Sequence, residues 1–118
     1  MNIEEFRQYC LSKKGVNESF PFDEQTLVFK VMGKIFALTS LETVEFRVNL
    51  KCDPETAIDL REQYSQVIPG YHMNKKHWNT VVVDSGLDII KLKLWIDHSY
   101  DIVVSKLPKK IKEELNSL

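Results

Sequence analysis

Three short apolar runs follow one another between residues 27 and 50, and they constrain the fold more than any other feature of the chain. They read LVFKVM, IFALTS and EFRVNL, and only Gly33 and Lys34 separate the first two. Short runs that are rich in β-branched and aromatic residues and joined by tight connections are typical of strands. The sequence therefore predicts an antiparallel meander of three strands.

Helical patterns flank this meander. Asn2 begins a capping-box pattern, and apolar residues at helical spacing continue to a stop at Gly15. The segment NESFPFDEQ is expected to be a loop that leads into the first strand. Asp53 followed by proline begins a second helix, which we expect to continue until the PG pair at 69–70 breaks it.

The C-terminal half predicts a second hairpin and two further helices. YHM and HWNTVVVD are the expected strands, with MNKK between them. A long helix follows residues 85–86, is expected to bend near Asp97–Ser99, and is succeeded by a short helix after Pro108. The order α-β-β-β-α-β-β-α-α predicts an α+β fold, an antiparallel sheet with helices on one face.

Length and composition agree with one globular domain spanning residues 1–118. The chain is 43% hydrophobic and 28% charged, as ordinary folded proteins are. No apolar run is long enough to span a bilayer, and the N-terminus lacks the pattern of a signal peptide, so we expect no membrane association. Cys10 and Cys52 are predicted to be buried or semi-buried free thiols rather than a disulfide, which favours a cytoplasmic location.

The net charge of −1 does not favour generic adhesion to nucleic acid, but the charge is unevenly placed. Residues 67–118 hold eight basic and six acidic side chains, whereas residues 1–66 hold eight basic and eleven acidic ones. The basic ending KLPKKIKEEL can contact phosphates, or it can be an amphipathic helix that docks on the body of the protein. The two interpretations are compatible.

The segment PGYHMNKKHWNTV is the most distinctive candidate site. It places basic residues beside aromatic ones, as nucleic-acid surfaces do. The candidate contacts are Asn74, Lys75, Lys76, His77 and Trp78. Local chemistry alone favours an ordinary hairpin, in which Trp78 is a core or rim aromatic and Asn74 forms the turn.

Metal binding and catalysis are not expected. His72 and His77 can approach each other on a hairpin, but the sequence offers no third ligand. Neither cysteine has a histidine near it in sequence, and no nucleophile motif or phosphate-binding glycine loop is present. We therefore expect a binding module that is not an enzyme and carries no cofactor and no metal.

The helix GLDIIKLKLWID is apolar on more than one face, since Ile90 and Leu94 lie off its main stripe. Burial inside the domain is the favoured interpretation. The alternative is that Ile90 and Leu94 form a surface for self-association or for a protein partner.

Four blocks of the chain resemble the MmcQ/YjbR family. They are FKVMGKIFA, VNLKC followed by proline, PGYHMNKKHWNTV and SYDIVVSKLPKK, in the order and spacing of that family. The resemblance implies a CyaY/frataxin-like two-layer sandwich, an antiparallel sheet with helices on one face and two β-hairpin wings. The wings would be the Lys30–Lys34 hairpin and the Tyr71–Trp78 hairpin. The iron site of CyaY-type frataxins is not implied, because the first helix offers only Glu4 and Glu5 from the acidic ridge.

The family label of a DNA-binding protein leads to a specific expectation for double-stranded DNA. The residues that would contact the phosphate backbone are Lys34, Lys51, Lys75 and Lys76, and those that would lie near a groove are Asn74, His77 and Trp78. The alternative is a protein- or small-ligand-binding domain with a concave site around His77 and Trp78, completed by His72, Asn79 and Tyr100. The exposure of Trp78 discriminates, because a buried indole cannot stack on bases.

Overall fold

A computed structural model describes residues 1–70 and 73–118, and in this part of the chain it contains four helices and six strands. Predictions that concern Tyr71 and His72 lie outside the described residues. The elements in chain order are α1 (Ile3–Leu11), β1 (Val16–Ser19), β2 (Thr26–Val31), β3 (Lys34–Ser40), β4 (Arg47–Lys51), α2 (Pro54–Gln63), β5 (Val67–Pro69), β6 (Trp78–Val82), α3 (Ile89–Ser105) and α4 (Lys109–Asn116).

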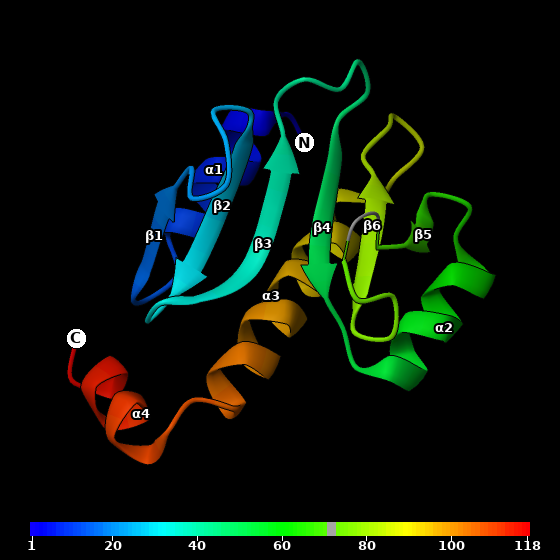
Figure 1. The fold of residues 1–118 in the computed structure, drawn as a ribbon. Coiled ribbons are helices and arrows are strands. Elements are labelled where there is room, and N and C mark those ends of the chain that lie inside the picture. The colour runs from blue at the N-terminus through cyan, green and yellow to red at the C-terminus, as the bar shows by residue number, and fades with distance from the viewer. Residues whose placement is uncertain (71–72) are drawn as a thin grey trace.

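The strands form one sheet in the order β1-β2-β3-β4-β6-β5, and every neighbouring pair is antiparallel (Figure 1). The predicted meander is confirmed as β2, β3 and β4. Its first turn is one residue earlier than expected, because Val31 pairs with Lys34 and leaves residues 32–33 at the tip.

Both edge strands differ from the sequence prediction. The segment expected to be a loop contains β1, whose VNES sequence lacks an apolar pattern and is held by pairing with β2. The strand that pairs with β6 from the other side is VIP at 67–69, whereas the predicted YHM strand falls largely on residues outside the described part of the chain. Its proline is compatible with a strand because it lies at the sheet edge, where one side of the backbone needs no partner.

Two helix predictions are also corrected. Asp53 caps α2 as expected, but the helix ends at Gln63 and the chain is already extended at Tyr64. Helix α3 continues through the polar cluster at 97–99 without a break. These polar side chains have partners outside the helix: Asp97 accepts a hydrogen bond from the Tyr9 hydroxyl at 2.7 Å, and Ser99 is buried against the sheet.

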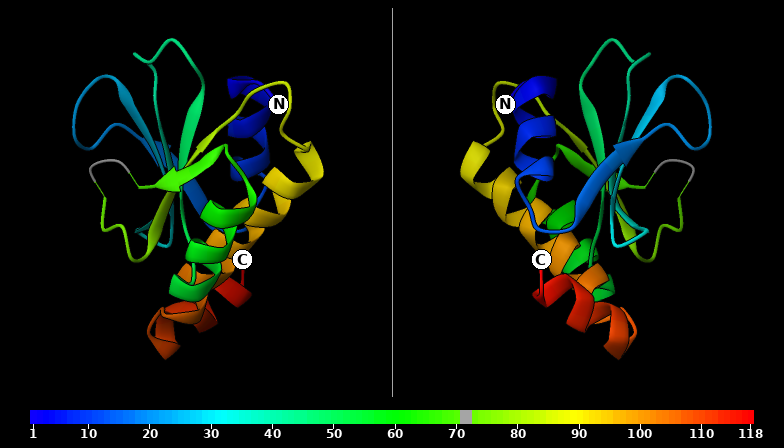
Figure 2. Two further views of the ribbon diagram at one scale, coloured as in Figure 1. Left: turned by 90° about the vertical axis from the view of Figure 1, so that its right-hand side faces the viewer. Right: turned by 90° about the vertical axis from the view of Figure 1, so that its left-hand side faces the viewer.

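All four described helices lie on one side of the sheet (Figure 2), as predicted. The main core fills the space between the layers, and its largest fully buried side chains include Phe6, Phe29, Phe36 and Ile96. A bulge in β3 leaves Phe36 unpaired between Ile35 and Ala37. The Ser99 hydroxyl of α3 donates to the Phe36 carbonyl at 2.5 Å, so the helix satisfies the group that the bulge frees.

The opposite side of the sheet, here called the open face, is not covered by any described helix (Figure 2). A second, smaller cluster of Val28, Leu38 and Trp78 lies there, with Ile35 and Met73 packed against it. The β1–β2 connection and the described residues before β6 extend on this side, so the open face is bordered by loops rather than closed by a layer.

Candidate functional site

The predicted lysines gather at one end of the sheet because the strands alternate in direction. The end at which β2 and β4 finish is the end at which β3 and β6 begin. Lys34 is the first residue of β3, Lys51 is the last residue of β4, and Lys76 lies two residues before β6. We call this end of the strands the lysine end.

A hollow of about 420 Å³ lies at the lysine end and is lined by four lysines. Its other lining residues are Gly33, Ile35, Val103 and Leu107, so no carboxylate faces it from the described part of the chain. Lys30, Lys34 and Lys51 come from the sheet, and Lys106 follows the C-terminal end of α3. We call this site the lysine hollow. The sequence prediction had missed Lys106, which only the packing of α3 brings to the strand ends.

The position of Lys51 is fixed by its main chain. Its backbone N–H donates to Ser99 Oγ at 2.8 Å, which ties the end of β4 to α3. Partial burial lowers the pKa of the Lys51 ammonium, and repulsion from Lys106 lowers it further. Two ammonium groups held near each other without a carboxylate between them favour a bound anion, which would relieve both effects.

Lys75 and Lys76 are exposed at a short turn before β6, at the same end of the sheet as Lys51, since Lys51 pairs with Trp78. Asn74 makes this turn, since its carbonyl accepts from Trp78 N at 2.9 Å and its side-chain oxygen accepts from Lys76 N at 3.0 Å. His77 is half-buried, and its carbonyl accepts from Cys52 N at 2.7 Å. Asn74 is thus the turn former of the ordinary-hairpin interpretation, and its amide oxygen is engaged by the backbone.

Arg61 of α2 holds this turn from the helix side, a role that sequence reasoning had missed. Its Nε donates to Asn79 Oδ1 at 2.6 Å, and its Nη2 reaches the carbonyls of Trp78 at 3.3 Å and of Lys75. Asn79 in turn donates from Nδ2 to the Ala57 carbonyl at 3.3 Å. The sequence signal for this role is weak, because it consists of one arginine in the last turn of a helix that is followed closely by a strand.

Trp78 is only 9% exposed and packs on the open face against Val28 and Leu38. Stacking on nucleic-acid bases requires an accessible ring face. The condition for base stacking by Trp78, an exposed indole, is therefore not met. The indole anchors the start of β6, directly after the turn that contains Lys75 and Lys76, through its apolar packing.

The alternative concave site is not assembled either. Trp78 and Asn79 are neighbours on one strand and point to opposite faces, with Asn79 directed towards α2. Tyr100 lies on the helix side, where its hydroxyl donates to the Lys14 carbonyl at 2.6 Å. His72 lies outside the described residues, and the other members of the predicted set do not meet.

Comparison with known proteins decides the family. The YjbR family model matches residues 11–102. The chain belongs to the YjbR family. It is 38% identical to the uncharacterised protein YjbR of Escherichia coli K12, over 120 aligned residues that cover both chains completely. It is also 38% identical to the uncharacterised protein YbdF of Escherichia coli O157:H7, with 88% of this chain and 85% of that protein covered.

Solved structures share the fold of this YjbR-family chain. The crystal structure of protein DR2400 from Deinococcus radiodurans, with domain DUF419, has a TM-score of 0.90 and 37% identity, and the match covers 98% of this chain and 88% of that one. A Pseudomonas syringae protein has a TM-score of 0.75 and 27% identity, covering 86% of this chain and 98% of its own. The expected family membership and α+β fold are thereby confirmed.

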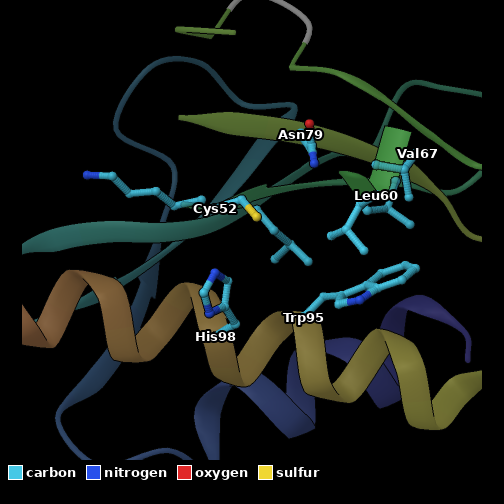
Figure 3. Close-up of a pocket in the computed structure, with 9 residues that line it drawn as sticks. Cys52, Leu60, Val67, Asn79, Trp95 and His98 are labelled. Carbon is cyan, nitrogen blue, oxygen red and sulfur yellow. The ribbon is translucent and has the colours of Figure 1, made fainter. Parts of the chain in front are cut away.

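In this YjbR-family chain Cys52 and His98 face a small cavity between the sheet, α2 and α3 (Figure 3). No histidine is near either cysteine along the sequence, and only the fold brings Cys52 and His98 to the same cavity. The cavity measures about 10 Å³, and Leu60, Val67 and Trp95 make much of its wall. Burial raises the pKa of the Cys52 thiol to about 11, with Asp53 adding to the effect. A thiol that stays protonated in an apolar cavity of this size is a structural residue.

Both cysteines are buried and free, as predicted. Burial also raises the pKa of Cys10 far above its ordinary value. In the described part of the chain, no three potential ligands among His, Cys, Asp and Glu lie close enough to hold a metal ion. The predicted pairing of His72 with His77 concerns a residue outside the described part of the chain.

The apolar residues of α3 that lie off its main stripe are exposed, not buried as favoured from the sequence. Ile90 is 69% and Leu94 is 56% exposed, and Ile89 lies beside them at 43%. The sheet already buries Leu92 and Ile96 on the opposite side of the helix. Self-association through Ile90 and Leu94 stays a prediction. Among the described helices, none has both the length and the apolar content needed to cross a bilayer.

Proposed function

We propose that this YjbR-family protein binds double-stranded DNA by contacting its phosphate backbone at the lysine end, without catalysing a reaction. The observation that carries the proposal is the lysine hollow, in which four lysines and no carboxylate line one site. Lys75 and Lys76 add two exposed positive charges at the lysine end. Phosphate contacts of this kind supply most of the sequence-independent affinity of DNA-binding proteins.

The mode of binding is electrostatic. Trp78 is buried and takes no part in base stacking, and the oxygen of Asn74 is used by its own turn. Sequence readout by these two residues is therefore not part of the proposal. Since the whole chain has a net charge of −1, attraction depends on the local cluster and should be sensitive to salt.

The proposed absence of catalysis has support from the one place where reactive residue types meet. Cys52 has a raised pKa, and His98 Nε2 lies 3.4 Å from the backbone nitrogen of Asp53 as a hydrogen-bond acceptor. A nucleophilic cysteine needs a lowered pKa and access to substrate. Neither condition is met at Cys52.

Fluorescence anisotropy with labelled duplex DNA at several salt concentrations tests the proposal. If about four lysines neutralise phosphates, the logarithm of affinity should fall against the logarithm of salt with a slope near −3.6. The double variant Lys34→Ala with Lys51→Ala should reduce the magnitude of this slope by about 1.8.

A matched control removes the same charge from elsewhere. Lys91 and Lys93 are exposed near the N-terminal end of α3, so Lys91→Ala with Lys93→Ala should leave the slope unchanged. No binding at low salt would overturn the proposal. Equal losses from both double variants would show that any positive charge suffices and that the lysine end has no special role.

A further inference from the structure

A second hollow lies on the open face, away from the lysine hollow. It has a volume of about 500 Å³, and its lining residues include Phe22, Asp23, Thr26, Leu38, Ser40 and Met73. Thr26 begins β2 and Ser40 ends β3, so the site is at the end of these strands opposite to the lysine end. We call it the apolar hollow.

The apolar hollow is built from a sheet floor and loop walls. Leu38 and its cross-strand partner Asn49 lie on the floor, and Leu38 belongs to the buried cluster of the open face. Phe22 comes from the β1–β2 connection, which extends on this side of the sheet (Figure 2), and Met73 lies in the described part of the β5–β6 connection. Phe22 is 66% exposed although it is a large aromatic residue.

Size and lining match the sites that proteins use for small organic molecules. Such sites measure roughly 300–1,000 Å³ and combine apolar walls with a few polar groups that orient the ligand. Here the apolar contacts are an aromatic ring, a thioether and a leucine, and the polar groups are hydroxyls and one carboxamide. The Asn49 side-chain oxygen is already used, because it accepts from the Thr80 hydroxyl.

Asp23 is the one charged residue among those that line the apolar hollow in the described chain. Its Oδ1 accepts from the backbone nitrogens of Gln25 at 2.8 Å and of Thr26 at 2.7 Å, which fixes the carboxylate at the rim. Its Oδ2 receives a longer bond of 3.3 Å from Thr26 Oγ1. The hydrogen bonds from Gln25 and Thr26 lower the pKa of Asp23, so the group is anionic at neutral pH.

Of the two cations on the same strand as Asn49, Lys51 lies at the lysine end and Arg47 is already paired. Arg47 forms an ion pair with Glu45, and its guanidinium is thereby neutralised within the β3–β4 hairpin. The rim of the apolar hollow therefore carries a negative charge beside an apolar surface. An anionic ligand would be repelled there, and a cationic one would be attracted.

We propose that the apolar hollow binds a small organic amine, whose ammonium lies against Asp23 Oδ2 and whose apolar body lies between Phe22 and Met73 above Leu38. A cationic head and an apolar body are both required, because Asp23 supplies a carboxylate and Phe22, Leu38 and Met73 supply apolar surface. This site is separate from the lysine end, so binding of the amine can be tested whether or not the protein binds DNA.

Titration with two aromatic probes of equal size tests the assignment. Amide spectra of the ¹⁵N-labelled protein are recorded while 1-naphthylmethylamine or 1-naphthoate is added. We expect saturable shifts with the amine at the amides of Thr26, Leu38 and Asn49, and affinity for the carboxylate lower by about tenfold, as expected for a change in one charge contact. Absence of saturable shifts with the amine, or equal affinity for both probes, would overturn the proposal.

Variants locate the two halves of the site. Phe22→Ala removes an exposed ring and should weaken amine binding about fivefold without changing the fold. Asp23→Asn keeps the oxygen that accepts from Gln25 and Thr26, and it should abolish the preference for the amine over the carboxylate. Ile58→Ala is the control, since Ile58 is an exposed apolar residue of α2 on the other side of the sheet. An Ile58→Ala effect as large as that of Phe22→Ala would show nonspecific adsorption and reject the site.

Discussion

The two connections that flank the lysine end are held in different ways. Residues 32–33 join β2 to β3, and both have positive φ angles, 48° at Met32 and 86° at Gly33. A two-residue type I′ turn requires positive φ at both positions and matches the twist of the strands that it joins. This connection depends on local backbone preference, and a Cβ at Gly33 would meet no atom within 4 Å.

The connection from β5 to β6 depends on distant residues instead. Its described residues are tied by Gly70 N to the Trp78 carbonyl at 2.9 Å and by the Asn74 turn. Arg61 of α2 adds bonds to Asn79 and to two backbone carbonyls of the same region. The lysines beside the two connections lie at the same end of the sheet. Lys30 and Lys34 are positioned by a local turn, whereas Lys75 and Lys76 are positioned by tertiary contacts. The position of the β5–β6 connection should therefore be far more sensitive to substitutions elsewhere in the chain.

Arg61→Ala should have the largest effect. It removes a charged donor from a buried amide oxygen and two carbonyls, and we expect a loss of about 3 kcal/mol in the free energy of unfolding. Urea denaturation measures it. Arg7→Ala is the matched control because Arg7 pairs with Glu18 at a more exposed site, and its cost should be much smaller than that of Arg61→Ala. Equal losses in the two variants would remove the special role of Arg61.

Gly70→Ala should have the next largest effect on the free energy of unfolding. A Cβ at this position would lie 2.8 Å from both Trp78 Cβ and the Trp78 carbonyl oxygen, and backbone must shift to admit it. We expect a loss of about 2 kcal/mol. Because the displaced strand carries the buried indole, tryptophan emission should also move to longer wavelength. A variant with unchanged stability and emission would show that the β5–β6 connection is not tightly packed there.

The same contrast explains which predictions from the sequence succeeded. The capping box at Asn2, the Asp53 cap and the meander of β2, β3 and β4 follow from neighbouring residues, and the structure contains all of them. The strand β1 lacks an apolar pattern, and β5 consists of three residues with a proline, so neither could be predicted locally.

For the candidate site, the sequence indicated the lysines of the strand ends but not how they are grouped. Lys30, Lys34 and Lys51 could be placed by strand order, whereas Lys106 reaches them only through the packing of α3. The burial of Trp78 depends on Met73 and on two other strands, which no local pattern around Trp78 reveals. The contacts of Arg61 likewise join residues 14–18 positions apart.

Gly33→Ala should have a smaller effect than Gly70→Ala. Space is free around this position, so the cost is only that of placing a Cβ in the left-handed region, about 1 kcal/mol. Thermal or urea unfolding measures it. Gly86→Ala is the control, because Gly86 has no positive φ and a Cβ there would make contacts of 3.4 Å or longer, so little change is expected. A loss at Gly33 equal to that at Gly70 would contradict the distinction between a local and a tertiary connection.

The smallest expected effect concerns Lys51, which ends the strand between the two connections. Burial and Lys106 lower its pKa, so on raising the pH it loses its charge before lysines with the ordinary value of 10.5. A phosphate binds the charged form, and affinity for DNA should therefore be full below the lowered pKa of Lys51 and decline as the pH rises through it. Lys51→Arg keeps the charge at all these pH values and should make the decline begin at higher pH. Anisotropy titrations at constant salt measure both proteins, with Lys91→Arg as the control. If the decline is the same in all three, Lys51 is not in contact with phosphate, and the exposed lysines of the two connections would have to provide the attraction by themselves.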